Sequence, residues 1–191
     1  MILITTTRRP SRRTRSFVRD LYHVIPTSRR RNRGKMSMED LNELAIREGA
    51  ERVIIVGTRR GNPSFLAFYE PSPSYLKPIS LIGLDGVSLR REITNRRAPH
   101  ARRLGIVYSR EELKEKARIL AKSFKTPILI QGLEELRSGT ESCEVAFLLS
   151  SDSGVRGTFY RVRPTEEIGP RMRISEIREY GEGIDNPEGR I

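Results

Sequence analysis

The sequence of 191 residues contains a single cysteine, Cys143, and two histidines, His23 and His100. One cysteine cannot form an intramolecular disulfide, and these three residues are too far apart for the usual spacing of a zinc site. No apolar run approaches the roughly 20 residues of a membrane-spanning helix, and the amino-terminal stretch does not have the pattern of a signal peptide. These absences predict a soluble, cytoplasmic protein with no membrane partner and no metal.

Motifs of nucleotide-binding and catalytic sites are also missing. There is no GxxxxGK[ST] loop, and no GxGxxG follows a predicted strand. The acidic pairs Glu111-Glu112 and Glu134-Glu135 fall on predicted helix surfaces, where acids usually face solvent. No nucleophile with an activating base is recognisable. We therefore predict that the protein is not an enzyme, has no catalytic residues and uses no cofactor.

Positive charge is what the sequence has in excess, and it is concentrated in two short segments. The formal net charge is +12, and residues 1–35 hold eleven Arg or Lys against one acid, Asp20. Residues 90–103 hold six Arg against Glu92. A protein that needs charge only for solubility would scatter it, so the local excess predicts a polyanionic partner. Thirty of the 36 basic residues are arginine, whose guanidinium group suits phosphate.

Hydrophobic periodicity predicts an α/β chain in which one order of elements occurs twice. In the first half we expect helices from Pro10-Ser11 to about Tyr22 and from a capping box at Ser37 to Gly49. The strands expected there span residues 2–6, 24–26, 52–56, 65–69 and 78–84.

In the second half a helix should begin with a capping box at Ser109 and Glu112, and a short stretch around Leu133–Leu136 should replace the second helix. The strands expected there span residues 104–108, 127–130, 143–149, 157–162 and 171–177. The repeated order predicts an internal duplication. Its parts are an N-terminal half (1–84), a basic connector (85–103), a C-terminal half (104–180) and a loose tail (181–191).

The first predicted helix carries arginines where helices usually carry acids. Arg8, Arg9, Arg12 and Arg13 crowd its positive end, and each should cost a few tenths of a kcal/mol. A bound phosphate would reverse that sign, because backbone N–H groups and the Ser11 hydroxyl would donate to it together with the guanidinium groups. The alternative is a solvated basic face; a second arginine cluster nearby favours nucleic acid.

Further along the same helix, arginines and apolar residues separate onto two faces. Phe17, Val18 and Leu21 share one face, while Arg12, Arg15 and Arg19 share the opposite one. The helix is therefore expected to pack on a core through one face and to present arginines with the other.

The second arginine cluster is followed by two weaker candidates. The cluster consists of Arg29, Arg30, Arg31, Arg33 and Lys35. Asn32-Arg33-Gly34 lies inside it, and Gly34 can take a turn geometry that presents backbone amides, so we favour an ordered or binding-ordered loop over a disordered tether. The turn at 59–63 either extends this phosphate-binding surface or is a hairpin tip that contacts only solvent. The connector residues Arg96, Arg97, His100, Arg102 and Arg103 either contact phosphate or belong to a linker. The predicted RNA-binding residues are Arg8, Arg9, Ser11, Arg12, Arg13, Arg15, Arg19, Arg29, Arg30, Arg31, Asn32, Arg33, Lys35, Arg59 and Arg60.

Three segments of the sequence resemble the Brix-domain family: TTTRRPS at 5–11, Asn32-Arg33-Gly34, and IIV at 54–56 leading to RGNP at 60–63. The resemblance is to short archaeal members, with a single Brix domain over 1–180, and to the small-subunit processome member that binds a guide snoRNA. It implies two similar α/β halves, each like the anticodon-binding domain of class IIa aminoacyl-tRNA synthetases. The chain departs from the eukaryotic pattern at Gly57-Thr58-Arg59, so protein contacts through that turn are not carried over.

The resemblance and the charge pattern together predict a non-catalytic ribosome biogenesis factor. Its partner would be an rRNA precursor or a small guide RNA, with ribosome-assembly proteins as further partners, and its role would be pre-rRNA processing and subunit assembly. The alternatives are a tRNA-binding accessory module and a metal-dependent nuclease, although no carboxylate cluster lies beside the basic segments. The oligomeric state does not follow from the sequence.

Overall fold

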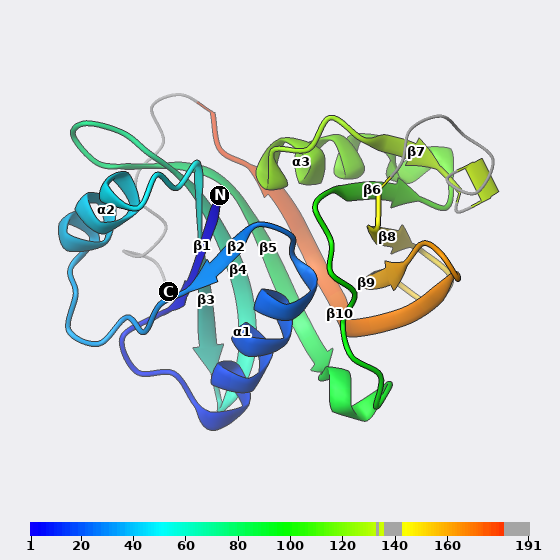
Figure 1. The fold of residues 1–191 in the computed structure, drawn as a ribbon, viewed down its shortest axis with the longest axis horizontal. Helices are drawn as coiled ribbons and strands as arrows, with labels where there is room; N and C mark the ends of the chain where they lie inside the picture. The colour runs from blue at the N-terminus through cyan, green and yellow to red at the C-terminus, as the bar shows by residue number, and fades with distance from the viewer. Residues whose placement is uncertain (133, 136–142, 182–191) are drawn as a thin grey trace.

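A single ten-stranded sheet organises the computed structural model, which describes residues 1–132, 134–135 and 143–181 (Figure 1). Its strands are β1 (Ile2–Thr6), β2 (Ser28–Arg30), β3 (Arg52–Arg59), β4 (Asn62–Pro71), β5 (Leu76–Ser88), β6 (Leu104–Tyr108), β7 (Leu129–Gln131), β8 (Val145–Ser150), β9 (Val155–Arg161) and β10 (Glu166–Glu179). The helices are α1 (Arg12–Val24), α2 (Met38–Arg47) and α3 (Lys114–Phe124), with short 3-10 helices η1 (Arg90–Glu92) and η2 (Glu111–Leu113). The α/β class predicted from the sequence is confirmed.

The sheet has two arms that meet at its centre. The strand order is β2-β1-β3-β4-β5-β10-β9-β8-β6-β7, and β5 and β10 pair antiparallel at the junction. In the first arm β1 is parallel to both β2 and β3, and in the second β6 is parallel to both β7 and β8. The remaining pairs in each arm are antiparallel. The two arms therefore share one order and one pattern of strand directions.

One hydrophobic core joins the arms, because α1 and α3 both contribute side chains to it. Figure 1 shows where these two helices lie. Phe17 and Leu21 of α1 are fully buried there. A row of aromatic rings crosses from one arm to the other, with centroid separations of 5.0, 5.9 and 4.8 Å along Phe68, Phe124, Phe147 and Phe159. Contacts at these distances contribute beyond simple burial. The core thus fixes α1 relative to the second arm.

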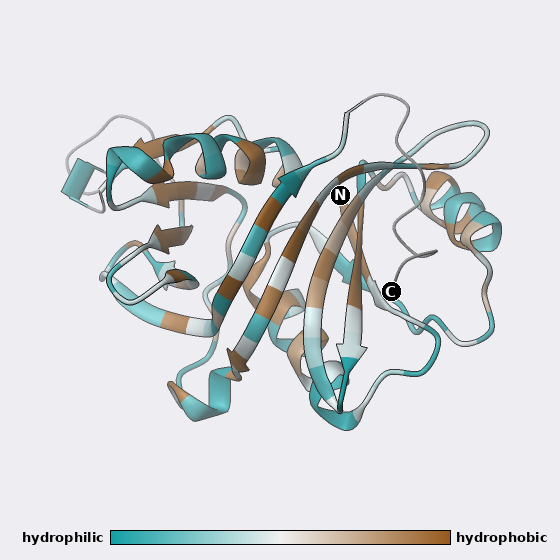
Figure 2. Ribbon diagram, turned by 180° about the vertical axis from the view of Figure 1, so that it is seen from behind, coloured by the Kyte–Doolittle hydropathy of each residue, from teal (hydrophilic) through white to brown (hydrophobic). Residues whose placement is uncertain are grey.

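The opposite face of the sheet is covered differently. Leu41 and Ala45 of α2 pack on Leu3, Val53 and Ile55 of the first arm. Figure 2 shows hydrophilic and hydrophobic residues alternating along the long central strands, as expected because successive side chains of a strand point to opposite faces. Helix α1 combines a buried face with predicted arginines on its exposed face.

The amino-terminal ends of the helices test the predicted capping motifs. At α2 the capping box is confirmed: Ser37 Oγ accepts from the Asp40 N–H at 3.0 Å, and Asp40 Oδ2 accepts from the Ser37 N–H at 2.8 Å. The box predicted at Ser109 and Glu112 is wrong. The chain makes the 3-10 helix η2 instead, which buries Leu113, and α3 begins at Lys114 without a side-chain cap.

The predicted strand at 24–26 is also wrong. Val24 ends α1, Ile25 is buried in the core, and the strand β2 begins only at Ser28. β2 lies at the edge of the sheet and pairs with β1 alone, so it needs no apolar sequence of its own. Leu133, Leu136 and most of the predicted tail, 182–191, lie outside the described residues. Within the described chain, no helix has the length and apolar character to cross a bilayer.

Candidate nucleic-acid interface

The candidate interface begins where the end of β1, the first turn of α1 and the end of β3 come together. Ser11 caps the helix, because its Oγ accepts from the Thr14 N–H at 3.0 Å, and the first turn contains no acid. Thr58 Oγ1 donates to Thr14 Oγ1 at 2.8 Å, which holds the β3–β4 hairpin against the helix start. The exposed residues Arg59 and Arg60 at that hairpin therefore lie beside the amino-terminal end of α1.

A cavity of about 370 Å³ opens next to this helix start, between the loop after β1 and the loop after β2. We call it the arginine hollow. None of its lining residues is acidic. Five arginines line it: Arg8, Arg15, Arg30, Arg31 and Arg33. Segments 1–15 and 30–34 of the sequence thus bring guanidinium groups to one concave surface.

The exposed face of α1 continues from the hollow as a stripe of three arginines. Arg12, Arg15 and Arg19 are exposed, whereas the residues on the other face are buried in the core. This separation confirms the two faces predicted from the sequence. Tyr22, which is 42% exposed, lies three residues beyond Arg19 on the same face. The sequence analysis missed Tyr22, although its helical spacing from Arg15 and Arg19 was a usable signal.

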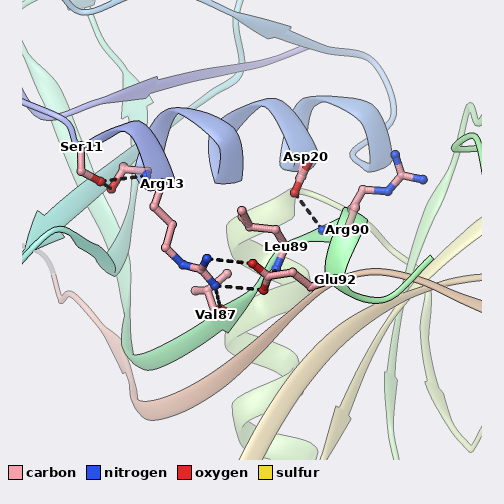
Figure 3. Close-up of polar contacts among 8 residues, drawn as sticks. Ser11, Arg13, Asp20, Val87, Leu89, Arg90 and Glu92 are labelled. Carbon is pink, nitrogen blue, oxygen red and sulfur yellow. Dashed lines mark hydrogen bonds and ion pairs between the residues drawn. The ribbon is translucent and has the colours of Figure 1, made fainter. Parts of the chain in front are cut away.

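Arg13 has a different environment from its neighbours, shown in Figure 3. Its guanidinium group donates to Glu92 Oε1 at 2.8 Å, to Glu92 Oε2 at 3.0 Å and to the Val87 carbonyl at 2.7 Å. The hydrogen bond from Arg13 holds the pKa of Glu92 below its usual value. Arg13 therefore ties α1 to η1 and is already occupied within the protein.

Asp20 is the only acid in the first 35 residues, and it faces away from the arginine stripe. Its side chain is buried, and Oδ2 accepts from the Arg90 N–H at 2.9 Å, at the start of η1 (Figure 3). Its role in the structure is to dock η1 on α1, so the stripe keeps its positive charge.

The second predicted cluster divides into paired and exposed residues. Arg29 and Arg31 both approach Glu48, at 3.8 and 2.8 Å. Arg33 is only 2% exposed and donates from Nε to the Met36 carbonyl at 2.9 Å. Gly34 has a φ of +55°, the turn conformation expected from the sequence. Arg30, Asn32 and Lys35 are exposed.

Nine of the predicted RNA-binding cations are exposed and form no ion pair with an acid among the described residues. We call them the nine free cations: Arg8, Arg9, Arg12, Arg15, Arg19, Arg30, Lys35, Arg59 and Arg60. They come from the β1–α1 loop, the exposed face of α1, β2 and its loop, and the β3–β4 hairpin. In the part of the chain that the structure describes, no three His, Cys, Asp or Glu side chains are grouped as metal ligands would be.

Comparison with known proteins identifies relatives over most of the chain. No family model matches it. A probable Brix domain-containing ribosomal biogenesis protein of Pyrobaculum aerophilum is 32% identical over 173 residues, covering 85% of this chain and 93% of the relative. A protein of the same description from Aeropyrum pernix is 48% identical over 90 residues, or 47% of this chain, and the match spans 50% of that relative.

The fold has a counterpart among solved structures. The crystal structure of a probable ribosomal biogenesis protein from Aeropyrum pernix superimposes with a TM-score of 0.75 at 32% sequence identity. The match covers 91% of this chain and 94% of that one. The likeness therefore extends over both arms of the sheet.

Proposed function

Since the chain belongs to the Brix-domain family of ribosomal biogenesis proteins, we propose that it binds precursor rRNA through the nine free cations around α1 and thereby assists rRNA processing and subunit assembly. The arginine hollow carries this proposal. It gathers arginines from two segments without any acid in its lining, and such a concave cationic surface attracts and holds phosphate. Binding requires no catalytic group, and the protein acts without chemistry of its own.

The helix start adds to the affinity for phosphate. Three arginines, Arg8, Arg9 and Arg12, surround the positive end of the α1 dipole without an acidic partner among the described residues, which is unfavourable until an anion arrives. An RNA phosphate placed there would accept from the guanidinium groups and from the free N–H groups of the first turn. Ser11 caps the helix and orients this turn, and Arg13 and Arg33 hold the surface in shape through their contacts within the protein.

The matching arms of the sheet favour a second candidate, binding of tRNA. We infer that each arm is one α/β unit of the anticodon-binding type and that the chain arose by its duplication. The support is the shared order and direction of the strands in the two arms. Precursor rRNA is the preferred partner because the described relatives are ribosomal biogenesis proteins. Competition between the two RNAs for the protein separates the candidates.

The test replaces three arginines of the hollow that make no ion pair with any described residue. The variant Arg8→Ala/Arg15→Ala/Arg30→Ala should bind an in vitro transcript of the small-subunit rRNA precursor on the order of ten- to a hundred-fold more weakly, because three phosphate contacts are lost. The control Arg47→Ala/Lys116→Ala/Arg118→Ala removes the same charge from exposed positions on α2 and α3 and should bind nearly as the parent does. Filter binding at one fixed salt concentration measures both.

Equal losses in the two triple variants would contradict the proposal, since net charge alone would then account for binding. Stronger competition by tRNA than by the rRNA transcript would favour the tRNA candidate instead. Crosslinking of the protein to RNA in its native cell extract, followed by sequencing, identifies the RNA site.

A further inference from the structure

A second hollow lies at the other end of α1, between the Val24–Ser28 segment and the connector. Its volume is about 600 Å³. We call it the connector hollow. Its lining includes two ring side chains at the end of α1, Tyr22 and His23. It also includes four residues of the connector: Arg90, Arg96, Arg97 and His100. No acidic residue lines it.

Both walls of the connector hollow are held by hydrogen bonds. On the connector side, Arg90 donates to the Arg96 carbonyl at 2.9 Å, and Arg161 donates to the Arg97 carbonyl at 3.1 Å. On the other side, Ser28 Oγ donates to the Ile25 carbonyl at 2.7 Å. The hollow is therefore a built feature of the fold, and the core fixes the two walls relative to each other.

The side chains in the hollow offer a flat ring next to cations. The rings of Tyr22 and His23 have centroids 5.3 Å apart, and Tyr22 is 42% exposed, so solvent reaches part of this residue. Burial and the nearby Arg90 lower the pKa of His23. Arg96 is paired with Glu166 at 2.9 Å, whereas the exposed Arg97 has no acidic partner among the described residues. An exposed ring and an unpaired guanidinium group that line one hollow are the combination that holds a base and its phosphate.

The position of the hollow links it to the arginine stripe. Arg12, Arg15, Arg19 and Tyr22 follow one exposed face of α1, and at 1.5 Å per residue the stripe is about 15 Å long. An RNA strand whose phosphates follow the arginine stripe would reach the connector hollow at the end of the stripe. An acidic peptide would use the cations but has no use for an exposed ring, so the arrangement favours a nucleic acid.

We propose that the connector hollow binds one unpaired nucleotide of the RNA, with its base stacked on Tyr22 and its phosphate on Arg97. This inference rests on the proposed RNA-binding function and specifies its substrate class: RNA that contains an unpaired base. Stacking on an aromatic ring tolerates any base, so the hollow selects for an unpaired nucleotide and not for a particular sequence.

The test compares an RNA hairpin that carries a single-nucleotide bulge of 2-aminopurine with the same hairpin lacking the bulge. The full-length protein should bind the bulged RNA more tightly and quench the 2-aminopurine fluorescence. Tyr22→Ala should weaken binding of the bulged RNA about five- to a hundred-fold, as expected for loss of one stacked base, and should not affect the paired RNA. Tyr22→Phe keeps the ring and should retain binding. Tyr75→Ala, which removes another exposed tyrosine, should change nothing.

Three results would overturn the inference: equal binding of the two hairpins by the parent, equal losses for both hairpins in Tyr22→Ala, or no quenching. Binding of a polyglutamate peptide that depends on Arg97 but not on Tyr22 would assign the hollow to an acidic protein segment and overturn it as well. A different result would contradict the proposed function itself: binding of the paired hairpin by the triple variant Arg8→Ala/Arg15→Ala/Arg30→Ala as tightly as by the parent.

Discussion

Individual arginines near the amino terminus differ in what their guanidinium groups contact. Arg30 is exposed and borders the arginine hollow. Arg33, three residues later, is buried and donates to the Met36 carbonyl and to Met38 Sδ, at 2.9 and 3.3 Å. A buried guanidinium group with fixed partners supports the loop, and an exposed one is available to phosphate. Adjacent residues of one type therefore have separable roles.

Replacing these two arginines singly should separate stability from binding. Arg33→Ala leaves a cavity and removes the donor from the partly buried Met36 carbonyl, so we expect the free energy of unfolding to fall by about 2–4 kcal/mol in urea denaturation. Arg30→Ala should change it by less than about 0.5 kcal/mol and should weaken RNA binding. An Arg33→Ala protein as stable as the parent would show that the buried contacts do not hold the loop.

Among the elements, α1 and η1 form the joint on which the candidate site depends. Arg13 and Asp20 of α1 both bind the short helix η1, through Glu92 and the Arg90 N–H. η1 is the start of the connector, and the connector forms one wall of the second hollow. These contacts therefore set the position of the connector relative to the arginine stripe of α1.

The pH dependence of stability should report on this joint. In the folded protein the pKa of Glu92 is lowered by its hydrogen bond to Arg13, below the value of about 4.3 expected in the unfolded chain. Its contribution is therefore present above about pH 4.3 and is lost as the pH falls through the folded pKa. For a partly exposed pair this contribution is at most about 1 kcal/mol, or about 2–4 °C in melting temperature.

Glu92→Gln should accordingly melt a few degrees below the parent at pH 7, and the two proteins should converge near pH 3. Circular dichroism melts at several pH values measure this. Glu43→Gln, an exposed substitution on α2, is the control and should melt like the parent at pH 7. A Glu92→Gln deficit that is absent at pH 7, or that persists unchanged at pH 3, would contradict the role of the Arg13–Glu92 pair.

The hydrophobic periodicity of the sequence was sufficient to predict the elements that have one buried and one exposed face. The buried and exposed faces of α1 and the capping box of α2 follow from local spacing alone. The contact of Arg13 with Glu92 spans 79 residues of sequence, so no local pattern contains it. The sequence did not predict β2, because an edge strand of Ser28, Arg29 and Arg30 has no alternation of apolar and polar residues. Local sequence thus predicted the exposed arginine face of α1, and tertiary contacts decided that Arg33 is buried and that Arg13 is paired.

At the scale of the whole molecule, charge and core are arranged on different sides of α1. The core joins both arms of the sheet and fixes the helix through its buried face. The formal net charge of +12 is unevenly spread, and the nine free cations lie on four neighbouring segments at one end of the first arm. A rigid fold that presents unpaired cations in this way suits a phosphate backbone, whose binding releases counterions.

The salt dependence of RNA binding tests this central claim most directly. If six to nine of the nine free cations contact phosphates, the affinity for the rRNA transcript should fall by about 10³ to 10⁵ between 50 and 200 mM salt. The variant Arg8→Ala/Arg15→Ala/Arg30→Ala should show a slope of log affinity against log salt that is shallower by about three, one for each contact removed. A nearly flat salt response of the parent, or an unchanged slope in the variant, would contradict RNA binding by this surface.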